Sequence, residues 1–304
     1  MSNKPGSMSS KTKARMLIVV AALLWSMSGL FGKAPYFDSW PAEIAGWPVR
    51  GPLLAFWRTL FASIVLFPLV RRPRWTIKLV PAVLVFAAMN VTFLTAVTKT
   101  TAANAIWLQN TAPAWVFLVG VMCLRERVHP RDWFLIGFAI LGVGLILSFE
   151  LQGESAAGML YGLLGGVSYA GVVLSLRWLR HEDAAWLVAI NHFAASVLLL
   201  PYVVYRDIWP TGEQYLVLSA FGILQLGLPY WLFARGLQGI SGHEASGLVL
   251  LEPLLVPVWV YLAWRHEVSY QSPQWWTMVG GGLILVGLVC RYVGLKREVE
   301  LVPK

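Results

Sequence analysis

Long apolar segments recur along the whole chain, and short polar stretches separate them. A transmembrane helix needs about 20 mostly apolar residues, and the apolar segments have about this length. The pattern therefore predicts an all-α polytopic membrane protein with ten transmembrane helices. The expected helices are residues 15–33, 52–70, 77–98, 101–123, 132–149, 157–178, 184–205, 214–235, 243–264 and 273–294.

Lys and Arg residues are distributed unevenly between the two sides of the membrane that this pattern defines. If the N-terminus is cytoplasmic, 18 of the 24 lie on the cytoplasmic side, 5 lie on the other side and Arg58 lies within a helix. Cytoplasmic loops are enriched in Lys and Arg, so we expect cytoplasmic tails at residues 1–14 and 295–304. The alternative, a total of nine or eleven helices, would destroy this alternation.

The composition excludes a soluble enzyme. Of the 304 residues, 58% are hydrophobic and only 13% are charged, whereas a soluble domain carries about 25% charged residues. The 16 Trp residues also fit a membrane protein, because indoles favour membrane interfaces. A net charge of +9 would suit a nucleic-acid partner only if it formed one basic face, and here it is divided by side of the membrane. Cys123 and Cys290 indicate neither a disulfide framework nor a metal site.

The two halves of the chain resemble each other. The segment FASIVLFP at 61–68 recurs as AASVLLLP at 194–201, and Pro113 and Pro253 hold corresponding places before a Glu and a Gly-rich helix. Because each half has an odd number of helices, the second half enters the membrane from the opposite side. Such inverted repeats are typical of secondary transporters, in which exchanging the conformations of the halves moves the opening of the cavity across the membrane. The predicted repeats are residues 15–149 and 150–294.

Short motifs at ordered places resemble the EamA-type members of the drug/metabolite transporter superfamily, over about residues 15–294. They are Leu24-Trp25-Ser26, Trp57-Arg58, Ala102-Ala103-Asn104-Ala105, Thr111-Ala112-Pro113, Glu126, Glu252-Pro253 and Glu267. The resemblance implies an inner-membrane carrier of small metabolites, often an exporter, with a central cavity between the halves. The second half departs from the first by placing Asn191 where the repeat puts Arg58, so a role of Arg58 is not duplicated.

Two ionisable residues fall within predicted helices, where charged groups are unfavourable and therefore candidates for function. Glu252 lies near the middle of the ninth helix and could bind a proton or contact the substrate. Alternatively, it is protonated and bonds a carbonyl that Pro253 leaves unpaired. Arg58 could meet Glu252, bind a substrate carboxylate, or extend towards the outer headgroups.

Polar and aromatic side chains on several helices are candidates for the wall of the cavity, because they offer both stacking and hydrogen bonds. The candidate substrate-contacting residues are Trp25, Asn90, Trp107, Asn110, Tyr169, Tyr230 and Glu252. Taken singly, each polar residue could instead hold helices together. Pro113 and Pro253 interrupt helices that should line the cavity, either as hinges or as static kinks.

Motifs for catalysis give no support to an enzyme. Gly239-Ile240-Ser241-Gly242 resembles the G-x-S-G of intramembrane serine proteases, but the Ser lies in a loop at the membrane edge, where no prepared base is evident. Metal-binding and phosphate-binding motifs are lacking in the sequence, so we expect no catalytic residues, metal or cofactor.

These observations together predict a secondary transporter, an exporter of small metabolites such as amino acids, that works by alternating access. Protonation of Glu252, with Arg58 nearby, is the candidate for energy coupling. The expected partners are a small-molecule substrate and the lipid bilayer, with no nucleic acid, and the chain would act as a monomer or homodimer. A polytopic membrane enzyme, a channel and a lipid scramblase are the alternatives.

Overall fold

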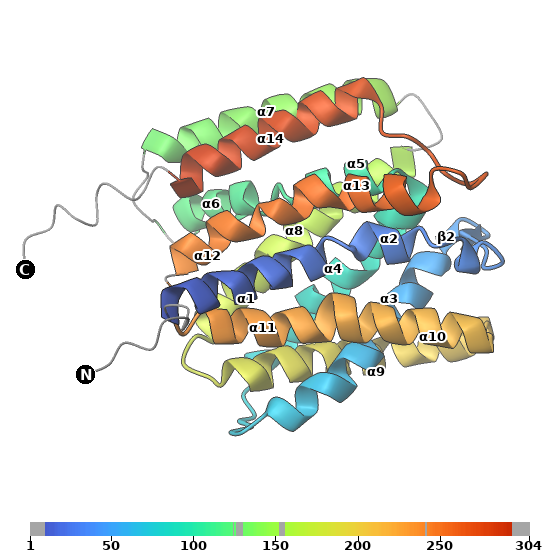
Figure 1. Ribbon diagram of the computed structural model, residues 1–304, viewed down its shortest axis with the longest axis horizontal. Helices are drawn as coiled ribbons and strands as arrows, with labels where there is room; N and C mark the ends of the chain where they lie inside the picture. The colour runs from blue at the N-terminus through green and yellow to red at the C-terminus, as the bar shows by residue number, and fades with distance from the viewer. Residues whose placement is uncertain (1–9, 124, 126–129, 152–155, 241, 294–304) are drawn as a thin grey trace, which may run out of the picture.

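The computed structural model describes residues 10–123, 125, 130–151, 156–240 and 242–293. This part of the chain is a bundle of helices that run side by side along one axis (Figure 1). The two-residue strands β1 (Glu43–Ile44) and β2 (Trp47–Pro48) form a short antiparallel hairpin in a loop. The predicted all-α polytopic fold is therefore confirmed, and the hairpin is a small local departure from it.

The observed helices follow the predicted spans to within a few residues at most ends. The first half contains α1 (Ser10–Trp25), α2 (Ser28–Gly32), the 3-10 turn η1 (Pro35–Phe37), α3 (Arg50–Leu66), the 3-10 turn η2 (Phe67–Leu69), α4 (Leu79–Lys99), α5 (Ala102–Gln109), α6 (Ala112–Met122) and α7 (Pro130–Glu150). The second half contains α8 (Ala156–Trp178), α9 (Ala184–Arg206), α10 (Gly212–Ala220), the π-helical segment η3 (Phe221–Gly227), α11 (Leu228–Gly236), α12 (Gly242–Val249), α13 (Leu251–Trp264) and α14 (Trp275–Val293).

Apolar length confirms the membrane assignment. In the described part of the chain, nine helices, some of them interrupted, are long and apolar enough to cross a membrane, and Trp275–Arg291 is a shorter apolar helix. Together they correspond to the ten predicted spans. Each half crosses the bundle five times, so the second half begins from the opposite end, as expected of an inverted repeat.

The first helix starts earlier than the sequence pattern predicts. Residues 10–14, expected in the polar tail, continue α1 because they pack on another part of the bundle. Ala14 is buried, and the side chain of Arg15 forms an ion pair with Glu244 of α12. Tertiary contacts thus extend a helix that hydropathy alone ends sooner.

Three spans are broken in the middle. The breaks lie at Ser26–Met27 between α1 and α2, at Asn110–Thr111 between α5 and α6, and at Leu250 between α12 and α13. Pro113 occupies the first turn of α6, and Pro253 occupies the first turn of α13. A proline lacks the N–H that would continue a preceding helix, but it is tolerated in the first turn of a new one. The two prolines therefore account for two of these breaks.

Glycine permits close helix packing where the two halves meet through α7 and α14, which lie side by side in Figure 1. A Cβ atom on Gly142 would lie 2.4 Å from the carbonyl oxygen of Gly280, and one on Gly280 would lie 2.7 Å from that of Gly142. Small residues allow such backbone approach in membranes, where helices gain little from hydrophobic burial. The glycine-rich helices are thus packing elements.

Both α1 and α14 have their outer ends on the same side of the bundle: α1 begins there and α14 ends there (Figure 1). We call this side the terminal end and the other side the opposite end. The loop between α2 and α3, with its hairpin, lies at the opposite end.

Candidate functional site

Arg58 of α3 lies inside the bundle and is only 3% exposed. Its Nη2 donates a hydrogen bond to Oδ1 of Asn90 at 2.5 Å, and its Nη1 donates to Oε1 of Gln225 at 3.4 Å. The guanidinium carbon lies 5.1 Å from the centroid of the Phe221 ring, within the range of a cation–π contact. Arg58 therefore does not extend towards the headgroups, and that interpretation of its role is wrong.

The π-helical segment η3 supplies two of these contacts. It carries both Phe221 and Gln225, and Nε2 of Gln225 donates to the carbonyl oxygen of Trp25 at 2.9 Å. Trp25 is the last residue of α1, where carbonyl groups lose their intrahelical partners. π-Helical turns are rare in proteins, but those that occur are frequently found at functional sites. Gln225 thus links Arg58 to the broken first span.

Close packing explains why η3 carries a glycine next to Phe221. A Cβ atom on Gly222 would lie 2.6 Å from the carbonyl oxygen of Arg58 and 2.5 Å from Cβ of Phe61. The backbone of η3 therefore approaches that of α3 more closely than any side chain would allow. This approach brings the Gln225 amide within reach of the guanidinium.

Tyr230 of α11 connects the same region to α1 and α9. Its ring meets that of Trp25 edge to face at 5.1 Å and that of His192 at 5.3 Å. Tyr230 and Glu252 both lie close enough to Arg58 to interact with its charge. Five residues predicted from sequence, Trp25, Arg58, Asn90, Tyr230 and Glu252, are thus gathered by the fold, and with Gln225 we call them the central cluster.

Glu252 differs from the other members of the central cluster in its bonding. It lies in the first turn of α13, directly after the break at Leu250, and it is half-buried. Within the described residues, its carboxylate has no hydrogen-bond or ion-pair partner, although it interacts at longer range with Arg58. Glu252 is therefore held to the cluster by charge and not by a hydrogen bond among the described residues.

The remaining predicted residues lie elsewhere. The indole of Trp107 is buried and packs on α14, because a Cβ atom on Gly281 would lie 2.3 Å from its Cε2 atom. Nδ2 of Asn110 donates to the carbonyl oxygen of Ile106 at 2.9 Å, within its own helical turn. The structure therefore places Trp107 and Asn110 in helix packing and at a helix end, and it brings neither into the central cluster.

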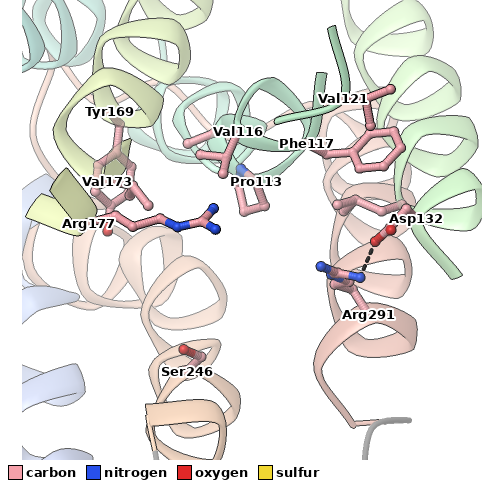
Figure 2. A pocket seen from close by; sticks show the side chains of 12 residues that line it. Pro113, Val116, Phe117, Val121, Asp132, Tyr169, Val173, Arg177, Ser246 and Arg291 are labelled. Carbon is pink, nitrogen blue, oxygen red and sulfur yellow. Dashed lines mark ion pairs between the residues drawn. The ribbon is translucent and has the colours of Figure 1, made fainter. Parts of the chain in front are cut away.

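A cavity of about 360 Å³ lies at the terminal end, between α6, α7, α8, α12 and α14. Figure 2 shows the side chains that line it. The cavity extends from the break in the fourth span towards the ends of α8 and α14. Two sequence candidates, Tyr169 and Pro113, line it. The described residues that line it are Ala112, Pro113, Val116, Phe117, Val121, Asp132, Leu135, Tyr169, Val173, Arg177, Ser246 and Arg291.

Sequence reasoning missed the charged wall of this cavity. In the sequence, Arg177 of α8 and Arg291 of α14 contribute only to the orientation of the chain, and Asp132 belongs to no motif. In the structure the Arg291 guanidinium forms an ion pair with the buried Asp132 carboxylate. An acidic residue at the start of an apolar span, together with a basic residue at the end of another, is the signal that could have indicated this pair.

A much smaller cavity, of about 20 Å³, lies towards the opposite end. It is lined by Lys33, Ala102, Val260, Trp264, Ser269, Tyr270 and Gln271. The pKa of the Lys33 ammonium group is lowered from 10.5 to about 8, first by burial and next by the positive charge of Arg50. Lys33 follows α2 directly, just outside the first span.

The two cavities occupy corresponding places in the inverted repeat. The larger lies between the end of α8, the second part of the broken fourth span, the first part of the broken ninth span, the start of α7 and the end of α14. The smaller lies between the end of α2, the second part of the ninth span, the first part of the fourth and the loop before α14. Exchanging the two halves converts one set of elements into the other, except for the end of α14, whose counterpart, the end of α7, does not line the smaller cavity.

Two residues singled out from sequence, Glu126 and Ser241, lie outside the described residues, as do the tails at 1–9 and 294–304. Within the described ranges, no three His, Cys, Asp or Glu side chains are grouped so that they could hold a metal ion.

Comparisons with known proteins match this architecture. Residues 12–148 and residues 156–292 each match the EamA-like transporter family. A solved protein, described only as a crystal structure, shares the fold with a TM-score of 0.63 at 18% sequence identity, over 94% of this chain and 99% of that one.

Curated relatives include three transporters. An uncharacterized transporter of Archaeoglobus fulgidus is 25% identical over 78% of this chain and 84% of its own length. The uncharacterized transporter YwfM of Bacillus subtilis is 25% identical over 90% of this chain and 92% of its own. The pseudopaline exporter CntI of Pseudomonas aeruginosa is 23% identical over 78% of this chain and 84% of its own.

Proposed function

Because the chain belongs to the EamA-like transporter family, we propose that it is a secondary transporter that exports small metabolites, such as amino acids, by alternating access. It is a multi-pass membrane protein, and we place it in the inner membrane. Its partners in this role are the lipid bilayer and a small-molecule substrate, with no nucleic acid and no catalysis. It acts as a monomer or a homodimer.

The main observation in support of this proposal is the unequal size of the two corresponding cavities. One has about 360 Å³ and the other about 20 Å³. In a carrier built from inverted repeats, the two halves adopt different conformations, and exchanging them opens the opposite side. A carrier of this kind has one large and one small cavity when it is open at the terminal end and closed at the opposite end.

The distribution of basic residues supports the direction of transport. With 18 Lys and Arg residues on the side of the termini and 5 on the other, the terminal end faces the cytoplasm. The larger cavity then lies on the cytoplasmic side, where an exporter loads its substrate. A relative that exports pseudopaline is consistent with this direction.

The central cluster supports a coupling mechanism through Glu252 and Arg58. When Glu252 is ionised, its charge attracts that of Arg58, and protonation removes this attraction. Arg58 is hydrogen-bonded to Gln225, which in turn holds the carbonyl group of Trp25 at the break in the first span. Proton uptake by Glu252 would therefore alter the contacts at this break. Pro113 and Pro253 would be the hinges about which the broken spans bend.

Counterflow into proteoliposomes tests this proposal. Purified protein is reconstituted, and saturable exchange is measured with labelled amino acids, sugars and cationic drugs, with and without a pH gradient. We expect saturable flux that responds to the gradient, and loss of that response in Glu252→Gln. The matched control is Glu213→Gln, since Glu213 is exposed in the first turn of α10.

The same flux measurements distinguish the proposed transporter from its alternatives. Flux that does not saturate, or lipid flipping without solute flux, would identify a channel or a scramblase. Glu252→Gln with an unchanged response to the pH gradient would refute the coupling role while leaving the transporter in place.

A further inference from the structure

Two positively charged side chains face each other across the larger cavity. Figure 2 shows Arg177 of α8 pointing into it from one wall and Arg291 of α14 from the other. The hydroxyl group of Ser246, on α12, also lines it. Guanidinium groups hold carboxylates and phosphates with paired hydrogen bonds, so two of them form a strong site for an oxyanion.

The charge of the lining favours an anion even though one acidic side chain is present. Asp132 forms an ion pair with Arg291, and its side chain is 4% exposed, while that of Arg291 is 33% exposed. Among the lining residues that the structure describes, two positive side chains and one negative side chain give one net positive charge. Arg291 keeps N–H groups on the open side of the pair, because a guanidinium has more donors than one carboxylate can accept.

The rest of the wall is apolar. Pro113, Val116 and Phe117 of α6 lie along one side, and Val173 lies beside Tyr169 on α8. The volume of about 360 Å³ lies at the small end of the range for small-molecule pockets, which is about 300–1,000 Å³. The cavity thus combines a cationic end with an apolar wall.

We propose that this cavity is the loading site for a small amphipathic solute that carries an oxyanion, held between Arg177 and Arg291 with its apolar part against α6. The inference rests on the proposed transport function and deepens it by naming the substrate class. Asp132 holds Arg291 in place while the cavity is empty, and it competes with the solute for the same guanidinium.

The corresponding cavity at the opposite end supports the same substrate class. Lys33 lies there at the end of the first span, as Arg177 lies at the end of the sixth. Exchanging the conformations of the halves would therefore offer a second cation to the same anionic group. A carrier for cations would not be expected to place a positive charge at both sites.

Binding of three probes with one shared apolar body tests the charge preference. The probes are 3-phenylpropionate, 3-phenylpropionamide and 3-phenylpropylamine, titrated by calorimetry into the full-length protein in nanodiscs of phosphatidylcholine. We expect the carboxylate to bind at least about tenfold more tightly than the amide, because a hydrogen bond to a charged group contributes about 1.5–3 kcal/mol, or about 10- to 100-fold. The amine should bind most weakly. Equal binding of all three, or of none, would overturn the inference.

Variants locate the site. Arg177→Gln should weaken binding of 3-phenylpropionate by about 10- to 100-fold, and Arg177→Lys should weaken it less. Asp132→Asn should act in the opposite direction and tighten binding by roughly 2- to 5-fold, because it removes the competing charge. Arg180→Gln is the matched control, since Arg180 is exposed just beyond α8 and outside the cavity. Arg177→Gln with unchanged affinity and an unchanged melting temperature would refute the site.

Two further experiments are needed. The first distinguishes a free solute from a lipid headgroup as the source of the oxyanion, and the second tests this inference independently of the transport function. Replacing part of the lipid by phosphatidylglycerol should leave probe affinity unchanged, and displacement of the probe would assign the site to a lipid headgroup instead. Counterflow of the same probes is measured in parallel. Flux of the amine with no binding of the carboxylate would overturn the substrate class but keep the transporter, whereas carboxylate binding without flux would keep the site but refute the transporter.

Discussion

At the opposite end of the bundle, the loop between α2 and α3 is tied to its neighbours by hydrogen bonds. The Arg50 guanidinium donates to the carbonyl oxygen of Trp40 at 2.6 and 2.9 Å and pairs with Asp38 at 3.0 Å. The Tyr202 hydroxyl group of α9 donates to the carbonyl oxygen of Pro48. At the terminal end, ion pairs join Arg15 to Glu244 and Arg291 to Asp132, and an open cavity remains between the helices.

The difference shows how a symmetric architecture acquires an asymmetric state. Both cavities are formed largely by corresponding helices, so the helices alone do not decide which one is larger. The opposite end has an ordered loop that carries its own hydrogen bonds, and the terminal end is joined by side chains that reach across from helix to helix. In the alternating-access mechanism proposed above, opening the opposite end would require breaking the contacts of that loop.

Cysteine labelling gives the largest expected contrast between the two ends. In a background of Cys123→Ser and Cys290→Ser, Val116→Cys places a thiol in the larger cavity and Val260→Cys places one in the smaller. We expect a polar maleimide to react about 10- to 1,000-fold faster at position 116, because in the proposed mechanism the state that opens the smaller cavity would be a minor one. Equal rates in detergent, with both variants folded, would show that the two cavities do not differ in access.

Gly222→Ala tests the rigid centre that lies between the two ends. The new Cβ atom would lie 2.6 Å from the carbonyl oxygen of Arg58, so we expect the variant to lose about 1–3 kcal/mol of stability by overpacking. Thermal unfolding of the purified protein measures this loss. Gly212→Ala, where nothing lies within 4 Å of the added atom, is the control and should not be destabilised. If both variants had the melting temperature of the wild type, η3 would be able to shift away from α3 and accommodate the added Cβ atom at little cost.

Arg50→Gln should shift the balance towards the state that is open at the opposite end. It removes the bonds to Trp40 and the ion pair with Asp38, and because these groups are partly exposed we expect only about a 3- to 10-fold faster labelling of Val260→Cys. Arg265→Gln, also exposed at that end, should leave the rate unchanged. A slower or unaltered rate in Arg50→Gln would rule out the loop as the closing element.

The smallest expected effect is a dependence of stability on pH at Lys33. Its pKa is about 8 in the folded protein and near 10.5 when unfolded, so between these values the unfolded chain binds more protons. Stability should therefore rise as pH increases from 8 to 10.5, while below pH 8 the buried charge of Lys33 destabilises the fold by a constant amount that does not change with pH. We expect the melting temperature to rise by less between pH 7.5 and 9.5 in Lys33→Met than in the wild type, by an amount worth below about 1 kcal/mol. Identical slopes would contradict the burial of Lys33.

Much of the central cluster could be predicted because charge in a membrane is informative. Arg58 and Glu252 stand out within apolar spans, and the fold brings them near Tyr230 and Asn90. Trp107 shows where the same reasoning stops. Its polar neighbours suggested a cavity wall, yet its indole packs on Gly281, because the rotation of a helix about its axis decides which face meets which partner. Apolar residues surround most of these helices, so hydropathy does not reveal that rotation.

The amino-acid sequence by itself determined the spans, their two-fold repetition and the inversion of the second half, because apolar length and helix number follow directly from the order of residues. Only the tertiary structure decided that η3 takes a π-helical form, that Asp132 meets Arg291, and that one of two corresponding cavities is much larger than the other. These features depend on contacts between residues far apart in the chain. Inverted repeats have two nearly equivalent packings. Small differences in contact energy decide which packing is adopted, and the hydropathy of either half does not reveal them.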